Sequence, residues 1–120
     1  MIIDTSSLVF GFANGKNIIE AALQRFPKME LLVSRSLIGE LEGISTNKGK
    51  RGDAARLALL SIKAKKVKVD NSEENVDEWI LDTASKNSGC IVVTNDGGLF
   101  KRLEGAGLKP FRARRNGTIR

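Results

Sequence analysis

Histidine and tyrosine are absent from this chain of 120 residues, and cysteine occurs once, at Cys90. Without histidine the chain lacks the commonest zinc ligand and the usual general base near neutral pH, which excludes His-dependent triads and ordinary zinc sites. A single cysteine cannot form a disulfide within the chain. Any acid, base or metal chemistry must therefore use carboxylates, hydroxyls, amides, Lys or Arg.

Long apolar runs are also missing. Stretches such as 57–60 and 91–93 fall far short of the roughly 20 residues that a membrane-spanning helix needs. No basic region precedes the apolar start at Ile2 and Ile3, so no secretory signal peptide is expected. These features predict a cytoplasmic protein that does not associate with membranes. The length and the 41% hydrophobic content predict one domain over residues 1–120.

Basic residues gather in two segments. The chain has 20 Lys and Arg against 14 Asp and Glu, a net charge of +6. Residues 48–68 carry +7 and residues 101–120 carry +6, so the remaining residues sum to −7. Basic segments beside an acidic remainder suit a phosphate-backbone ligand held next to a carboxylate site. The alternative is an ordinary solvated surface of Lys and Arg, and charge alone does not decide between the two.

Apolar periodicity predicts strands alternating with helices. Strands are expected at 1–3, 31–33, 67–69, 90–93 and 109–113, and helices over 17–26, 37–42, 53–65, 75–84 and 95–103. A polar, mobile loop is expected over 43–52. The strand at 90–93 is the most apolar and should be central and buried. Such alternation implies parallel pairing through right-handed crossovers, hence an α/β fold of three α/β/α layers around a mainly parallel sheet.

Four carboxylates are the candidate site residues. In folds of this kind, ligands bind beyond the carboxyl ends of the strands. Asp4 and Asp96 each follow a predicted strand and belong to that edge, Asp77 lies in the first turn of a helix, and Glu40 lies on the apolar side of its helix. Two carboxylates about 4 Å apart repel by roughly 4 kcal/mol at an effective dielectric of 20, so converging acids need protons or a cation. Hard oxygen ligands favour Mg²⁺ or Mn²⁺.

Each carboxylate also has a purely structural interpretation. Asp96 can cap a helix, and Asp77 can be favourable only because anions suit a helix N-terminus. Asp4 after a short strand can open a turn. Glu40 can pair with one of two arginines, Arg35 or Arg51.

Four segments of the chain resemble the PilT N-terminal, or PIN, domain family of metal-dependent nucleases. They are MIIDTSSLV at the start, SLIGELEG around Glu40, DEWILDTA from Asp77 and IVVTNDGGL from Ile91, and they span almost the whole chain in the family's order. The resemblance implies an acidic cluster that holds one or two Mg²⁺ or Mn²⁺ ions for endoribonuclease chemistry. Its members would be Asp4, Glu40, Asp77 and Asp96, with Ser6 and Thr94 as supporting hydroxyls. Many family members carry a further acid where this chain has Gly98.

Within the family, the chain is most similar to compact archaeal-type members, which are related to VapC-type toxins or to rRNA-processing endonucleases. The resemblance therefore implies RNA as the substrate, an antitoxin protein as the partner of a toxin, and a homodimer. Six basic residues are expected to contact the RNA backbone, the last three of them in a basic C-terminal tail over residues 112–120: Lys48, Lys50, Arg51, Arg112, Arg114 and Arg115.

Three alternatives to this function stand beside it. A catalytically silent RNA-binding module of the same fold is suggested by Gly98, where an acid is missing. A receiver-type phosphoacceptor domain fits the length, but it requires adjacent acids after the first strand, where Asp4 is followed by Thr5. A metal-dependent DNA nuclease would use the same acids, and competition between RNA and DNA would distinguish it.

Four further side chains have packing interpretations. Trp79 lies on an apolar stripe with Val76 and Ile80, which favours core packing over base stacking. Cys90 in a buried strand is expected to be an inert core thiol. The sequence does not assign Phe10 and Phe12 to one of three places: the core, the wall of a substrate groove or a dimer surface.

Overall fold

The computed structural model describes residues 1–65 and 67–120. Within those residues, strands alternate with helices as the periodicity predicts. In chain order the elements are β1 (Ile2–Ile3), α1 (Thr5–Ala13), α2 (Ile18–Arg25), β2 (Leu32–Ser34), α3 (Arg35–Ser45), α4 (Lys50–Ala64), β3 (Lys68–Asp70), α5 (Val76–Lys86), β4 (Val92–Val93) and α6 (Gly97–Gly105).

The strands are short and run parallel. β1 pairs with β4, and β2 pairs with β3. The backbone N–H of Leu32 donates to the carbonyl of Met1 at 2.9 Å, which joins the two pairs in the order β3-β2-β1-β4. A single parallel bridge between Val93 and Phe111 adds one residue beyond β4. β4 is therefore flanked on both sides, as its apolar sequence predicts, whereas the strand expected over 109–113 is reduced to this bridge and to an antiparallel bridge between Ala113 and Ile119.

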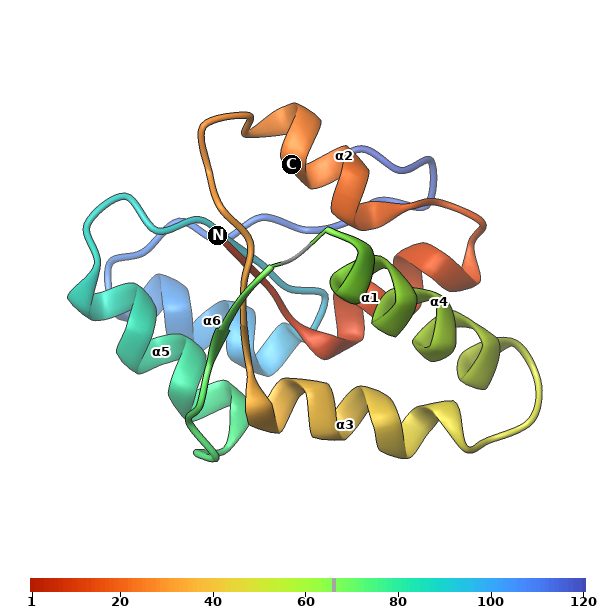
Figure 1. Cartoon of the computed structure of the whole chain (residues 1–120). Coiled ribbons are helices and arrows are strands. Elements are labelled where there is room, and N and C mark those ends of the chain that lie inside the picture. Colours follow the sequence, from red (N-terminus) through yellow and green to blue (C-terminus); the bar gives the residue numbers. More distant parts are fainter. Residues whose placement is uncertain (66) are drawn as a thin grey trace.

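The helices cover both faces of the strands, which gives the predicted α/β/α layers. Figure 1 shows α5 and α6 on one side of the strands and α1, α2 and α4 on the other. This division follows from right-handed crossovers, because the chain steps in one direction from β1 to β2 to β3 and then returns to β4. All strands consequently point their carboxyl ends toward the same edge.

The predicted loop over 43–52 is wrong for most of its length. α3 continues to Ser45 and α4 already begins at Lys50, so only residues 46–49 form the turn between them. The polar residues at these helix ends are exposed, so they show no apolar periodicity that would predict a helix. Gly52 permits the close turn, because a Cβ at this position would lie 1.8 Å from the carbonyl oxygen of Asn47.

The helix α1 is missing from the prediction, which assigned no element to residues 5–13. Its buried residues, among them Ser7, Leu8 and Phe12, are spread around the helix, so the amphipathic stripe that reveals a surface helix is absent. Gly11 lets α1 approach α2, since a Cβ there would lie 2.6 Å from Cβ of Ile18. The consequence for the fold is that the residues directly after β1 form a buried helix that packs against α4.

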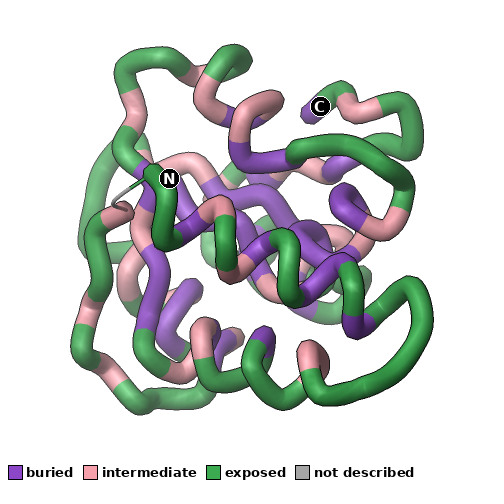
Figure 2. The backbone as a smooth tube through the Cα atoms, turned by 45° about the vertical axis from the view of Figure 1, so that its right-hand side comes forward, coloured by how far each residue is buried: buried purple, intermediate pink, exposed green. Residues whose placement is uncertain are grey.

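Buried residues from every layer form one core, drawn in purple in Figure 2. Trp79 is 2% exposed, which confirms its core assignment, and its indole N–H donates to Oδ2 of Asp70 at 3.0 Å. Cys90 precedes β4 and is half-buried, so its predicted place inside a buried strand is wrong, but it packs against the core and burial raises the pKa of its thiol. Phe12 belongs to the core, whereas Phe10 is half-buried. In the part of the chain that is described, no helix is long and apolar enough to cross a membrane.

Candidate active site

A cleft of about 940 Å³ opens beyond the carboxyl ends of β1 and β4. Ser6 lines this cleft. The four carboxylates predicted from the sequence also line it, namely Asp4, Glu40, Asp77 and Asp96. Thr94 is buried beneath this lining and reaches it through hydrogen bonds. The structure thus brings together side chains that are up to 92 positions apart in the sequence.

Asp4 is the buried carboxylate of the cleft. It caps the N-terminus of α1 rather than opening a turn, because its Oδ1 accepts hydrogen bonds from the Ser7 backbone N–H at 2.9 Å and the Ser6 hydroxyl at 2.8 Å. The Thr94 hydroxyl donates to Oδ2. Burial raises the pKa of Asp4, and these hydrogen bonds oppose that rise only in part. In its charged form, Asp4 is therefore a carboxylate that would gain from a nearby cation.

Asp96 joins the same network from the other strand. Its Oδ1 accepts the Leu99 backbone N–H at 2.9 Å and so caps α6. Its own backbone N–H donates to the Thr94 hydroxyl at 3.1 Å, and this hydroxyl in turn donates to Asp4. The structural interpretation of Asp96 as a cap is thus confirmed, and the cap lies in the cleft beside Asp4.

Asp77 lies half-buried in the first turn of α5. Burial raises its pKa most, and the negative charges of Asp96 and Asp4 raise it further. The backbone N–H of Asp77 donates to the side chain of Asn75, the residue that caps α5. Three carboxylates from α1, α5 and α6 therefore interact electrostatically in one cleft.

Glu40 is exposed at the edge of the cleft, so its predicted place on the apolar side of α3 is wrong. Leu37 and Leu41 are fully buried, while Glu40 turns away from them. Its carboxylate accepts a hydrogen bond from the Thr5 hydroxyl at 2.6 Å. Neither predicted arginine pairs with it among the described residues, and Arg35 instead donates to the side chain of Asn71.

Asn95 is a residue of the cleft that the sequence reasoning missed. Its Oδ1 accepts hydrogen bonds from the Ser7 hydroxyl at 3.0 Å and from the Ala113 backbone N–H at 2.9 Å, and its Nδ2 donates to the Ala113 carbonyl at 2.9 Å. Asn95 therefore ties α1 and the C-terminal segment to the end of β4. Its position between Thr94 and Asp96 was the available signal.

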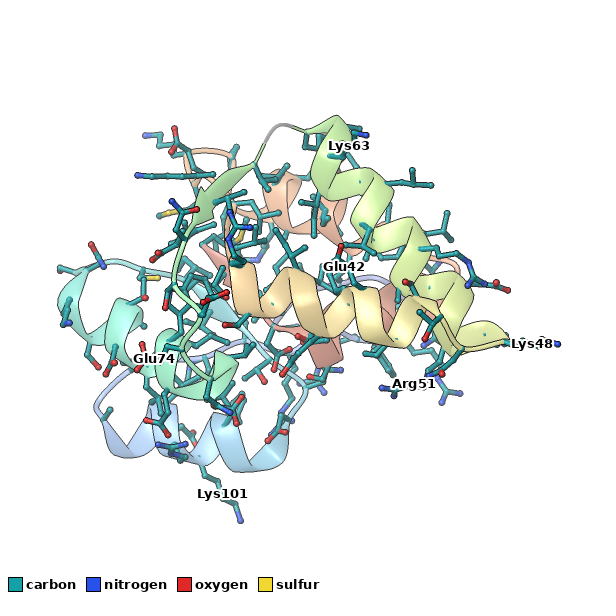
Figure 3. All side chains as sticks on the ribbon, turned by 60° about the horizontal axis from the view of Figure 1, so that its bottom comes forward. Glu42, Lys48, Arg51, Lys63, Glu74 and Lys101 are labelled. Carbon is teal, nitrogen blue, oxygen red and sulfur yellow. The ribbon has the colours of Figure 1, made fainter. Side chains whose placement is uncertain are left out.

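The predicted nucleic-acid contacts separate into two groups. Arg51 lines the cleft with the acids, whereas Lys48 and Lys50 are exposed around the α3–α4 turn. Figure 3 shows Lys48 and Arg51 at this turn, far from Lys101 on α6. The other group lies in residues 112–120, where the backbone folds back on itself through hydrogen bonds between residues 112 and 120 and between 114 and 118. In that segment the Arg112 guanidinium lies 4.0 Å from the Phe100 ring centroid.

The possible metal ligands among the side chains of the cleft are all oxygen atoms, from carboxylates, hydroxyls and amides. Mg²⁺ and Mn²⁺ prefer such ligands. Within residues 1–65 and 67–120, no three acidic side chains lie close enough to hold one ion between them directly. Mg²⁺ commonly keeps several waters and binds through one or two carboxylates. The arrangement accordingly fits a partly hydrated cation better than a closed protein cage.

Comparison with known proteins agrees with this architecture. The family model described as PIN like domain matches residues 1–115. The chain belongs to the PIN-like domain family. Among curated relatives, Ribonuclease VapC4 of Methanocaldococcus jannaschii is 37% identical over 106 residues, covering 83% of this chain and 79% of that protein.

Two further likenesses have lower identity. Ribonuclease VapC9 of Archaeoglobus fulgidus is 29% identical over 108 residues, covering 89% of this chain and 77% of that protein. The solved structure titled as the PIN domain endonuclease Utp24 superposes with a TM-score of 0.77 at 23% identity, covering 99% of this chain and 87% of that one. At that identity the second likeness shows a shared PIN fold.

Proposed function

We propose that this PIN-like chain is a metal-dependent endoribonuclease that hydrolyses RNA phosphodiester bonds in the carboxylate cleft. The observation that carries the proposal is the meeting of Asp4, Asp77 and Asp96 at one strand edge, where burial raises the pKa of both Asp4 and Asp77. Hydrogen bonds compensate for the burial of Asp4 only in part, and the three negative charges still oppose one another. Their retention is explained if the site binds a cation and its substrate.

In this proposal, Asp4, Glu40, Asp77 and Asp96 hold one or two Mg²⁺ or Mn²⁺ ions. A divalent cation would neutralise phosphate charge and make water a better nucleophile at neutral pH. Thr94 fixes the orientation of Asp4 and the backbone of Asp96 through its hydroxyl. Gly98 offers no side-chain oxygen, which favours one ion over two.

The basic residues would attract the RNA backbone. Arg51 is exposed at the lining of the cleft and would contact a phosphate next to the reacting one, while the exposed lysines of the α3–α4 turn would extend the path. If several phosphates are engaged, log affinity should fall with log salt by about 0.7 per contact for single-stranded RNA. A complex that is insensitive to salt would argue against this path.

We further infer that the chain acts as a VapC-type toxin, because both curated relatives are named as VapC ribonucleases. An antitoxin protein would then be its partner, the working form would be a homodimer, and the site of action would be the cytoplasm. A role in rRNA processing is the other form of the same activity.

The test is cleavage of a panel of single-stranded and structured RNAs with Mn²⁺ or Mg²⁺. Wild type is compared with Asp96→Asn, with an EDTA control, and with Asp82→Asn, which removes an exposed carboxylate of α5 outside the cleft. Loss of cleavage in the first variant and in EDTA, with activity retained in Asp82→Asn, supports the proposal. Adding excess single-stranded DNA as a competitor tests whether the site prefers RNA.

The second candidate is a catalytically silent RNA-binding module. Gly98 favours it, as does the lack of a compact group of three acids among the described residues. Salt-sensitive RNA binding by wild type without cleavage of any RNA in the panel, at any concentration of Mn²⁺ or Mg²⁺, would select this candidate.

A further inference from the structure

The cleft continues beyond the carboxylates into an apolar end between α1 and α3. Its walls are Val9, Phe10, Ala13, Gly43 and Ile44. We call this part the apolar end of the cleft. It lies directly next to the acids, since Asp4 caps the same helix that carries its first wall.

One aromatic ring and one missing side chain give the apolar end its shape. Phe10 is only half-buried, although Phe12 on the same helix belongs to the core. On the facing helix, Gly43 has ordinary helical geometry, and a Cβ built there would meet no atom within 4 Å. An apolar wall thus faces open space, which a flat group can enter.

Polar groups surround the entrance to this space. Asn14 and Asn47 are lining residues of the cleft, together with Arg51. The Asn14 Nδ2 donates to the Phe10 carbonyl at 2.8 Å, and among the described residues its Oδ1 accepts no hydrogen bond. Amides beside an aromatic face are the groups that read the edge of an unstacked base, while Arg can neutralise a phosphate.

We propose that the apolar end of the cleft binds one unpaired nucleobase of single-stranded RNA, with Phe10 as the stacking surface. This inference rests on the proposed function for the identity of the ligand. Phe10 follows Asp4 by six residues, about 9 Å along the helix axis at 1.5 Å per residue. A nucleotide adjacent to a phosphate at the acids reaches that far.

A cation at the carboxylates, together with Arg51, favours RNA over an apolar peptide as the occupant, because both attract a phosphate. An apolar peptide has no group that either positive charge would bind. A nucleotide instead brings a phosphate for the cation and for Arg51, an apolar face for Phe10 and polar edges for the amides. Stacking on an aromatic side chain tolerates any base, so the subsite selects for unpaired RNA rather than for one sequence.

The test compares the binding of two fluorescent oligomers of equal length by anisotropy in Ca²⁺, which also binds oxygen ligands and can occupy the carboxylate site, and again in EDTA. One is a single-stranded oligoribonucleotide and the other is the same ribose-phosphate chain without bases. Four proteins are used: wild type, Phe10→Ala, Gly43→Leu and Gly39→Leu. Gly39 lies one turn before Gly43 on α3, has equally open surroundings and does not line the cleft, so it is the matched control.

Wild type and Gly39→Leu should bind the base-bearing oligomer about tenfold or more tightly than the abasic one. Gly43→Leu fills the space, and Phe10→Ala removes the stacking face, so both should reduce the ratio toward one. Because Gly43→Leu adds a side chain in open space, its result stands even if Phe10→Ala folds poorly.

Three results would each overturn the inference: equal binding of the two oligomers by wild type, no binding of either oligomer, or an unchanged ratio in Gly43→Leu. Any of them would make a protein side chain the better candidate for the occupant of the apolar end. Base-dependent binding without any RNA cleavage in Mn²⁺ would instead refute the proposed enzyme and keep the base subsite. The two failures are thus distinguishable.

Discussion

Asp96 is expected to have two roles, and two substitutions can separate them. Its carboxylate caps α6 through the Leu99 N–H at 2.9 Å, and it is one of the proposed cation ligands. Asparagine is as good a cap as aspartate, whereas alanine lacks the acceptor. Asp96→Asn therefore keeps the cap and removes the charge, while Asp96→Ala removes both.

The expected change in stability follows from the size of the domain. Loss of a cap costs about 1 kcal/mol in the free energy of unfolding. At about 2.1 cal/mol/K per residue, unfolding 120 residues has an entropy of about 250 cal/mol/K. The melting temperature of Asp96→Ala should then fall by about 4 °C, and that of Asp96→Asn should stay within about 1 °C of wild type.

The electrostatic consequence falls on Asp77. The charge of Asp96 helps to raise the pKa of Asp77, so both variants should lower that pKa toward its ordinary value. Titration of the Asp77 carboxyl carbon by NMR measures the shift, and Asp53→Asn on α4 is the control that should leave it unchanged.

Thermal melting and RNA cleavage in Mn²⁺ complete the assay. Both variants should lose cleavage, although only Asp96→Ala loses stability. Wild-type cleavage by Asp96→Asn would refute the role of the carboxylate. A melting temperature for Asp96→Asn as low as that of Asp96→Ala would show instead that an amide cannot replace the cap.

Three more outcomes are expected. Burial raises the pKa of Asp4, so the contribution of this group to stability is complete below the unfolded-state pKa and is lost as pH rises through the folded-state pKa. Paired thermal scans should therefore show that Asp4→Asn melts at a higher temperature than wild type at pH 7, but not at pH 3. Gly97→Ala, in open space, should stabilise α6 by up to about 1 kcal/mol, whereas Gly98→Ala should gain less because its Cβ lies 3.3 Å from the capping carboxylate; chemical denaturation compares them. Asn95→Ala should speed hydrogen exchange at the Ala113 N–H, and unchanged exchange would contradict the tie.

The sequence predicted the frame of the fold better than the details of its helices. Apolar segments located β1, β2 and β4 to within one or two residues, because these strands are largely buried and bounded by polar residues, whereas the exposed β3 was located by the alternation of Val with Lys. Helix α1 escaped notice because several of its sides are buried, which removes the polar face. The residues at the ends of α3 and α4 look like loop residues, since exposed polar side chains are compatible with either state.

The meeting of Asp4 and Asp96 was predictable from topology. Asp4 and Asp96 both follow parallel strands, whose carboxyl ends share one edge, and the cleft opens there. The Thr5–Glu40 and Ser7–Asn95 hydrogen bonds were not predictable, because each joins side chains on elements whose docking no local pattern encodes. The roles of these residues in catalysis stay predictions until the variants are measured.

The pairing of β1 with β4 has a consequence for how the protein is made. Ile2 lies opposite Val92, so β1 waits for 90 further residues before β4, its neighbour on the side away from β2, exists. At the 5–20 residues per second of protein synthesis, that delay is about 5 to 20 s. During this time Asp4 lacks the Thr94 hydroxyl and the Asp96 carboxylate that complete its surroundings. Translation that stops before residue 96 would therefore release a fragment that lacks the complete carboxylate cleft.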